Sequence, residues 1–363
     1  MDYTLQLQYI YYIAIIAGFI ISQLWKDKKN SGVALVGWVM VFILSYYIGA
    51  RDLDTGVDTL NYKYAFDRVT GTTFSEWKDF LDTFGEDPIF KAILIIGHQI
   101  GDFQSTLWLI SVLTLSISFV FSIRISRILG NNNPVAVFCC YLISFYCFGQ
   151  QYNIIRAGLA APLLLNFYLS LFQSRKRSAL IYAVLALGIH FSSIIAILLA
   201  VVAKLWHFSI KTGAMIYFGA MILSFFGIGV KNIDFFTSMD NKKVKAYTGD
   251  YYTSFDYKTG FRYGFAAFNT IVYFLERWLM RFKNGNTALL NYLLRLFVLL
   301  SSIFFAWFTI PFSDRVGAFS WNIIPFMIFI AIWSRFQNRK SLSRLISFLI
   351  ISFMNLGISL ISG

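Results

Sequence analysis

The sequence contains few charged residues. Of its 363 residues, 13% are Asp, Glu, Lys or Arg, whereas 58% are hydrophobic and 19% are aromatic. A soluble domain carries about twice that share of charge, so this chain has too little polar surface to cover its apolar part in water. The same composition excludes a disordered or collagen-like chain. What remains is an all-α, multi-pass membrane protein, long enough for about twelve spans of about 20 residues.

Cysteine and histidine are also scarce, at three residues each. Cys139, Cys140 and Cys147 lie in one apolar run and lack metal-ligand spacing, so we interpret them as small membrane residues. Because the histidines are far apart and no GxxxxGK[ST] motif occurs, we expect no metal, no cofactor and no nucleotide hydrolysis. In a membrane protein, the net charge of +13 indicates which loops face the cytoplasm, and it does not indicate binding of nucleic acid.

Twelve apolar runs indicate one integral membrane domain covering residues 1–363. The runs lie at about 9–25, 33–49, 105–123, 134–150, 153–172, 178–189, 190–203, 213–230, 263–281, 288–309, 318–333 and 345–361. A further run at 88–100 is too short to span comfortably. Its Asp87-Pro88 start is typical of a helix cap followed by Pro at the first helical position, so we expect a re-entrant or interfacial helix. We also expect two short helices to meet near His190.

Lys and Arg gather in alternate loops, which predicts the orientation. The basic residues of these loops are Lys26, Lys28, Lys29, Arg124, Arg127, Arg175, Lys176, Arg177, Lys204, Lys211, Arg277, Arg281, Lys283, Arg335, Arg339, Lys340 and Arg344, and the only acidic ones are Asp27 and Glu276. Short basic loops face the cytoplasm. We therefore expect both termini and the two long loops, 50–87 and 231–262, to be external.

Three arginines are candidates for an anion site at that external face. Arg51 ends the second span, and Arg156 and Arg315 lie at the external ends of inward-running spans. Helix N-termini carry partial positive charge, and a guanidinium binds phosphate in a bidentate way. Two or three of these arginines converging would form a diphosphate site at the external membrane interface. The alternative for each is an arginine that snorkels to lipid headgroups. Nearby polar residues, among them Gln151 and Asn153, favour the site.

The same region supplies acid and base candidates. Asp58 and Tyr62 are four residues apart and share a face if their segment is helical. Glu86 heads the short 88–100 helix. His190, at the expected break, is either a structural histidine or a cavity residue able to accept a proton near neutral pH. The choice between Asp58 and His190 as base stays open, as does activation of the acceptor without a discrete base.

The motifs in this order resemble those of the EpsG-type polysaccharide polymerases. RDLDTGVDTLNYKYAF resembles the family's "R…GTDxxxY…F" loop, EDPIF its "EPLF", YNIIRAGLA its "N.IRQ.IA", HFSSI its "H.SA" and DRVGAFSW its "R…YF" region. The resemblance spans about residues 45–325. The chain departs from the pattern at Val57, at Ala157 and at Phe319-Ser320.

The resemblance implies a GT-C-like fold and an O-antigen or capsule polymerase of the Wzy type in the bacterial inner (plasma) membrane. Such an enzyme transfers a glycan from undecaprenyl diphosphate to the non-reducing end of a lipid-linked repeat unit. Donor, acceptor and bilayer would be its partners, with a chain-length regulator protein as a further candidate. Arg51, Arg156 and Arg315 would bind the diphosphate, Asp58 or His190 would act as base with Glu86 orienting it, and Tyr62, Asn153 and Gln151 would contact substrate.

Two other functions are compatible with the composition. A flippase for the same lipid-linked glycan would also have about twelve spans and buried arginines. Transporters commonly contain two-fold repeats, which the sequence lacks, and a flippase has little use for a long acidic outer loop. An O-antigen ligase is a third alternative, and only the resemblance of RDLDTGVD and EDPIF to the EpsG-type motifs disfavours it.

Overall fold

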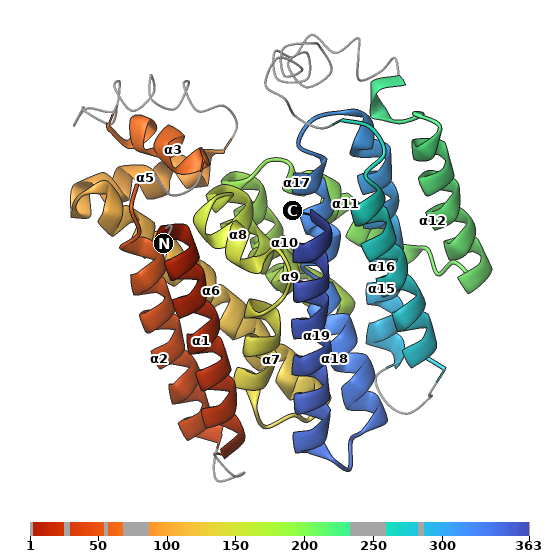
Figure 1. Cartoon of the computed structure of the whole chain (residues 1–363), viewed down its shortest axis with the longest axis horizontal. Helices are drawn as coiled ribbons and strands as arrows, with labels where there is room; N and C mark the ends of the chain where they lie inside the picture. The colour runs from red at the N-terminus through yellow and green to blue at the C-terminus, as the bar shows by residue number, and fades with distance from the viewer. Residues whose placement is uncertain are drawn as a thin grey trace. The chain divides into compact units, whose positions relative to one another are not determined.

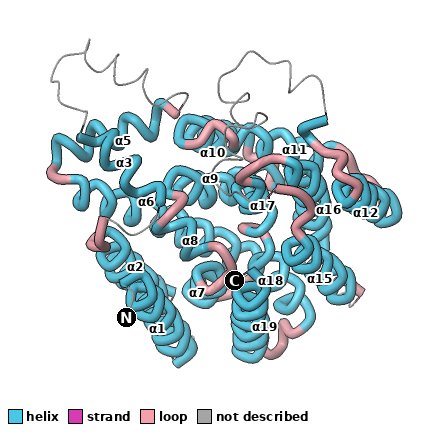
Figure 2. The backbone as a smooth tube through the Cα atoms, turned by 45° about the horizontal axis from the view of Figure 1, so that its top comes forward, coloured by secondary structure: helices cyan, strands magenta, loops and turns pink. Residues whose placement is uncertain are grey.

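The computed structural model describes residues 3–24, 30–53, 57–67, 87–232, 259–281 and 287–362. Within these ranges the chain is nearly all helical and contains no strand (Figure 2). It falls into two compact units, Met1–Leu198 with Phe336–Asn355, and Leu199–Arg335 with Leu356–Gly363. The expected all-α class is confirmed for the described part of the chain.

The first unit contains most of the N-terminal helices (Figure 1). They are α1 (Tyr3–Leu24), α2 (Asn30–Gly49), α3 (Val57–Asp67), α5 (Pro88–Ile100), α6 (Phe103–Leu129), α7 (Pro134–Leu142), α8 (Cys147–Tyr152), α9 (Ile155–Phe172) and α10 (Lys176–Ile189). Two helices, α11 (Ser193–Leu205) and α19 (Lys340–Ser362), contribute residues to both units.

The second unit contains the remaining helices. They are α12 (Ile210–Phe225), η1 (Val230–Asn232), α15 (Tyr263–Leu279), α16 (Thr287–Ala306), η3 (Trp307–Thr309), α17 (Ser313–Trp321) and α18 (Ile324–Arg335). Within this unit α16 is central, because it packs against α12, α15, α17 and α18.

The helices have the length and composition of membrane spans. Seven helical segments in the described residues are long and apolar enough to cross a bilayer, and three shorter apolar helices accompany them. The chain is therefore a multi-pass membrane protein. The expected total of about twelve spans, the GT-C-like arrangement and the single domain over 1–363 stay predictions.

Two of the irregular elements expected from the sequence occur in the structure. Helix α5 covers Pro88–Ile100, with Pro88 in the first turn. The run from 178 to 203 divides into α10 and α11, and His190 caps the end of α10 in an extended conformation. A proline that fixes the first turn and a break beside Gly188 are local features, so the sequence is able to specify them.

The run expected at 134–150 is not one helix. It divides into α7 and the short α8, with Tyr146 between them at a positive φ of 75°. An aromatic residue rarely adopts that conformation, and neither glycine nor proline marks the turn. The turn returns the chain toward α9, so that α8 packs against α7 and α9.

Helix α9 is the core of the first unit. Fifteen of its residues are buried, from Ile155 to Ser170, and α6, α8 and α10 pack against it. Arg124 of α6 reaches α9, where its Nη1 and Nη2 donate to Asn166 Oδ1 at 2.7 Å and Ser170 Oγ at 2.8 Å. With α9 enclosed in this way, the side chains of its first turn have a fixed position.

Candidate functional site

Arg156 lies in the first turn of α9. Its Nε donates to the Tyr62 hydroxyl at 3.1 Å, and its guanidinium also stands over the Tyr62 ring, 5.5 Å from the ring centroid. Its Nη1 forms an ion pair with Asp87 Oδ2. Among the described residues Nη2 has no hydrogen-bond partner, and 24% of the side chain is exposed. Arg156 is thus held from two sides with one edge accessible.

Asp87 connects Arg156 to the break between α10 and α11. Its carboxylate is almost fully buried. One oxygen pairs with Arg156, and the other accepts the Phe191 backbone N–H at 2.8 Å. Although Asp87 precedes Pro88 in the N-cap position of α5, its side chain makes no capping bond. The prediction that this residue caps α5 is therefore right about the helix start and wrong about the side chain.

Helix α3 docks on the junction between α8 and α9. The Asp58 N–H donates to Asn153 Oδ1 at 3.3 Å, and the Thr59 hydroxyl donates to the Tyr152 carbonyl at 3.2 Å. Because residues 57–67 are helical, Asp58 and Tyr62 lie one turn apart, as the sequence predicts. Tyr62 is buried against Phe90 of α5, at 5.3 Å between ring centroids, and Asp58 is half-buried.

Arg51 is fully buried at the end of α2. Its Nη1 donates to the Ile48 carbonyl at 2.7 Å, and its Nη2 donates to the Thr59 hydroxyl at 3.4 Å. Through Thr59 it is linked to the same α8–α9 junction as Asp58. Gln151 is buried in α8, and its amide nitrogen has no hydrogen-bond partner among the described residues.

His190 is next to the Phe191 N–H that Asp87 accepts. It is half-buried, at the point where α10 ends. Through Asp87, the backbone at Phe191, which follows His190, is therefore connected to Arg156. Of the predicted residues, Tyr62 contacts Arg156 directly. Asp58 lies one helical turn before Tyr62 and is bonded to Asn153, and His190 precedes the Phe191 whose N–H is bonded to Asp87.

Two glycines allow the helices of this cluster to approach closely. A Cβ on Gly158 would lie 2.2 Å from the Gln150 carbonyl oxygen, and a Cβ on Gly188 would lie 2.5 Å from the Ile89 side chain. Gly158 is therefore needed where α9 passes α8, and Gly188 where α10 passes α5. Both contacts adjoin residues that hold Arg156.

The relation of two further predicted residues, Arg315 and Glu86, to this cluster stays a prediction. Arg315 is in the second unit, in the first turn of α17, as expected, with its guanidinium 4.5 Å from the Phe312 ring centroid. Glu86 lies outside the described residues, as does most of the 231–262 loop. The convergence of Arg51, Arg156 and Arg315 on one anion stays a prediction.

This arrangement is suited to binding an anion. A guanidinium fixed by an aromatic hydroxyl and a carboxylate loses little side-chain entropy when a ligand binds, and the N-terminus of α9 adds partial positive charge. Sequence reasoning missed Asp87 as part of the cluster. The signal was its position inside the "EPLF"-like segment EDPIF, directly before the first helical proline, which also fits a simple cap.

The comparison with protein families agrees with the motifs. The EpsG family matches residues 34–363, which is most of the chain. No curated protein and no solved structure matches the chain. The family match includes the segments that contribute Arg51, Asp58, Asp87, Arg156 and His190. This is a polysaccharide-biosynthesis membrane protein, and it belongs to the EpsG family.

Proposed function

We propose that the chain is a polysaccharide polymerase, an inverting and metal-independent glycosyltransferase. It moves a glycan from undecaprenyl diphosphate to the non-reducing end of a lipid-linked repeat unit at the external face of the bacterial plasma membrane. The observation that carries this proposal is the Arg156 guanidinium, held by Tyr62 and Asp87 with its Nη2 edge accessible. Membership of the EpsG family supports the polysaccharide substrate class.

Arg156 would act on the leaving group. The acceptor hydroxyl oxygen attacks the anomeric carbon, and the bond from that carbon to the diphosphate oxygen breaks with its electron pair. The negative charge that develops on the diphosphate is greatest in the transition state. A fixed cation at that position stabilises the transition state more than the ground state, which is what accelerates the reaction.

The acceptor proton needs a base, and two residues of the cluster are candidates. Asp58 is held at the α3 N-terminus by the bond to Asn153, and His190 follows α10 beside Phe191. Asp87 is a less suitable base, because both of its oxygens are engaged with Arg156 and Phe191. We therefore assign Asp87 to positioning Arg156, and keep Asp58 and His190 as the candidate bases.

The test is elongation by the purified protein in detergent, supplied with undecaprenyl-diphosphate-linked repeat units. We expect a ladder of products from the wild-type protein. Arg156→Ala should lower the rate by about 10²–10³, the usual effect of removing one positioned charge donor. Arg156→Lys should restore part of it, since a lysine keeps the charge without the planar fork. Arg315→Ala should lower the rate by a similar factor and remove the long products if Arg315 shares the diphosphate.

A matched control is available on α3. Lys63 directly follows Tyr62 and is a partly exposed cation whose partner, Asp67, lies one turn further along α3. Lys63→Ala should therefore leave the ladder unchanged. Wild-type ladders from both Arg156→Ala and Arg315→Ala would contradict the proposal. If the wild-type protein leaves the repeat unit unchanged in detergent but moves it across sealed vesicles, the chain is a flippase.

A further inference from the structure

The guanidinium of Arg51 is bound inside the protein. Arg51 lies just after α2 and is 0% exposed, so a substrate phosphate has no access to it in this structure. Its Nη1 donates to the Ile48 carbonyl at 2.7 Å. That carbonyl belongs to the last turn of α2, where backbone oxygens lack helical partners and a nearby cation is favourable. Arg51 therefore completes the end of α2.

The backbone of Arg51 is fixed by the packing of α2 on α6. Gln104 of α6 donates from Nε2 to the Arg51 carbonyl at 3.3 Å. A Cβ on Gly49 would lie 2.5 Å from the Trp108 Cα, so the glycine lets the two helix backbones approach closely just before Arg51. The arginine thus extends from a closely packed pair of helices.

Thr59 binds the other end of the Arg51 guanidinium. Nη2 of Arg51 donates to the Thr59 hydroxyl at 3.4 Å, and the same hydroxyl donates to the Tyr152 carbonyl at 3.2 Å. Thr59 is fully buried, and Tyr152 is the last residue of α8. One hydroxyl on α3 therefore joins the end of α2 to the end of α8.

Thr59 and Tyr62 lie on one face of α3. They are three residues apart in a helix, which places their side chains side by side, and both are buried. Phe66, one turn further along, is buried on the same face against the Phe103 ring, at 5.4 Å between centroids. Tyr62 contacts Arg156 through its hydroxyl and its ring. A bond that fixes Thr59 therefore also fixes the Tyr62 hydroxyl beside Arg156.

We infer that Arg51 and Thr59 are positioning residues, which hold α3 against the α8–α9 junction so that Tyr62 orients Arg156. This role replaces the direct diphosphate contact that the sequence predicts for Arg51. The effect on elongation rests on the proposed function, whereas the docking of α3 does not. When α3 is released, Tyr62 no longer fixes Arg156, and a misplaced group of this kind slows a reaction by up to about 10²-fold.

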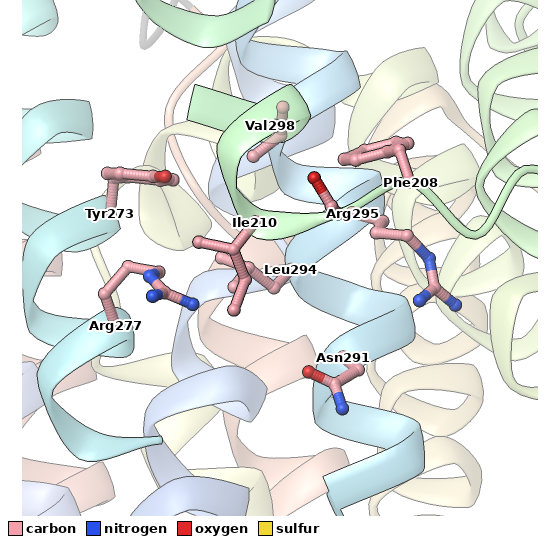
Figure 3. Close-up of a pocket in the computed structure, with 10 residues that line it drawn as sticks. Phe208, Ile210, Tyr273, Arg277, Asn291, Leu294, Arg295 and Val298 are labelled. Atoms are coloured by element: carbon pink, nitrogen blue, oxygen red, sulfur yellow. The ribbon is translucent and has the colours of Figure 1, made fainter. Parts of the chain in front are cut away.

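A matched arginine control lies in the second unit. Arg295 of α16 lines a pocket there, and Figure 3 shows its guanidinium turned away from that of Arg277. Like Arg51, it donates to a carbonyl in the last turn of a helix, from its Nε to Ala203 of α11 at 3.1 Å. Because Arg295 belongs to the second unit and α3 to the first, loss of this bond should not release α3.

The first measurement is hydrogen–deuterium exchange of the α3 amides in the full-length protein in detergent, without substrate. We expect Arg51→Gln and Thr59→Val each to speed this exchange about tenfold, because each removes a buried hydrogen bond. Thr59→Ser keeps the hydroxyl and should exchange like the wild type. Arg295→Gln and Thr114→Val are the controls and should not change it. Thr114 is also buried, but its hydroxyl donates within α6, to the Ile110 carbonyl at 2.8 Å.

The second measurement separates kcat from KM in the elongation assay. Arg51→Gln and Thr59→Val should each lower kcat about 10–100-fold and leave KM within about twofold of the wild type. The double variant should be at most about twofold slower than the slower single variant, because both residues act through one bond. A direct phosphate contact of Arg51 would instead multiply the two effects.

Three results would overturn the inference. One is slower elongation by Arg51→Gln with α3 exchange at the wild-type rate, another is multiplied effects in the double variant, and the third is wild-type behaviour of Thr59→Val in both measurements. If Arg51→Gln does not fold, the comparison of Thr59→Val with Thr59→Ser decides the same question. A wild-type protein that makes no ladder overturns the proposed function instead, and the exchange rates then decide whether Arg51 and Thr59 hold α3.

Discussion

At the scale of single residues, Asp87 explains how the candidate site is assembled. Its two oxygens satisfy a guanidinium from α9 and a backbone N–H from the α10–α11 break. A buried carboxylate without such partners would be costly. Asp87 therefore holds Arg156 and the Phe191 backbone in place, and they in turn hold Asp87. Arg156 is consequently oriented before any substrate arrives.

We expect Asp87→Asn to lower both stability and activity. The substitution leaves a carbonyl oxygen for the Phe191 N–H but removes the counter-charge of Arg156. Breaking a fully buried ion pair costs about 3–5 kcal/mol; here Arg156 keeps some contact with water, so we expect about 2–3 kcal/mol. The measurements are the apparent melting temperature in detergent and the elongation rate, which Asp87→Glu should partly restore.

The control for this prediction is Asp67→Asn, which removes the charge of the exposed pair with Lys63 on α3. An exposed pair contributes about 0–1 kcal/mol, so melting temperature and elongation should stay near wild type. A merely structural Asp87 would lower the melting temperature without changing the elongation rate of the folded fraction, and that result would contradict its role in positioning Arg156.

The sequence predicts the members of this cluster better than their partners. Arg156 and Tyr62 can be predicted from the sequence because an arginine and a tyrosine lie beside apolar runs there. Both residues belong to the cluster. The pairing of Asp87 with Arg156 joins residues 69 positions apart, and a single sequence does not encode such a contact locally. Since Asp-Pro is also a common helix start, the local pattern favoured the simpler role.

At the scale of helices, the contact between α8 and α9 controls the direction in which Arg156 points. The Gly158 backbone approaches the Gln150 carbonyl so closely that no side chain fits between them. Asn153, which receives the Asp58 N–H, lies in the turn between the same two helices. A change in their spacing would therefore move Arg156 and the α3 docking position together.

We expect Gly158→Ala to destabilise the protein by about 1–3 kcal/mol, the usual cost of overpacking, and to lower the elongation rate. The control is Gly149→Ala in α8, where an added Cβ meets no atom within 4 Å. That substitution should be neutral or stabilising by up to about 1 kcal/mol. Melting temperature and elongation rate measure both variants, and similar losses from the two would show that the α8–α9 contact is not the cause.

Helices with local signals are predictable from this sequence, and the others are not. The bounds of α5 follow from Pro88 and from the polar residues after Ile100, and the break near His190 follows from Gly188 and the run length. The division of 134–150 was missed because its residues are apolar throughout and Tyr146 gives no turn signal. Tertiary packing on α9 overrides the local preference there.

At the scale of the whole chain, the charge distribution predicts sidedness. Lys and Arg concentrate in alternate loops, and this asymmetry orients membrane proteins during insertion. It would place Asp52, beside the buried Arg51, outside, and Arg175, between α9 and α10, inside. The proposed diphosphate site depends on this orientation, because it is assigned to the external face.

Cysteine labelling tests this orientation directly. The native Cys139, Cys140 and Cys147 are all buried, so a membrane-impermeant maleimide should give little background. Asp52 and Arg175 are both exposed. We expect Asp52→Cys to be labelled in intact spheroplasts, and Arg175→Cys only after the membrane is permeabilised, because the reagent reaches a cytoplasmic thiol by no other route. The opposite pattern would put Arg156 at the cytoplasmic face and would contradict the proposed reaction at the external face.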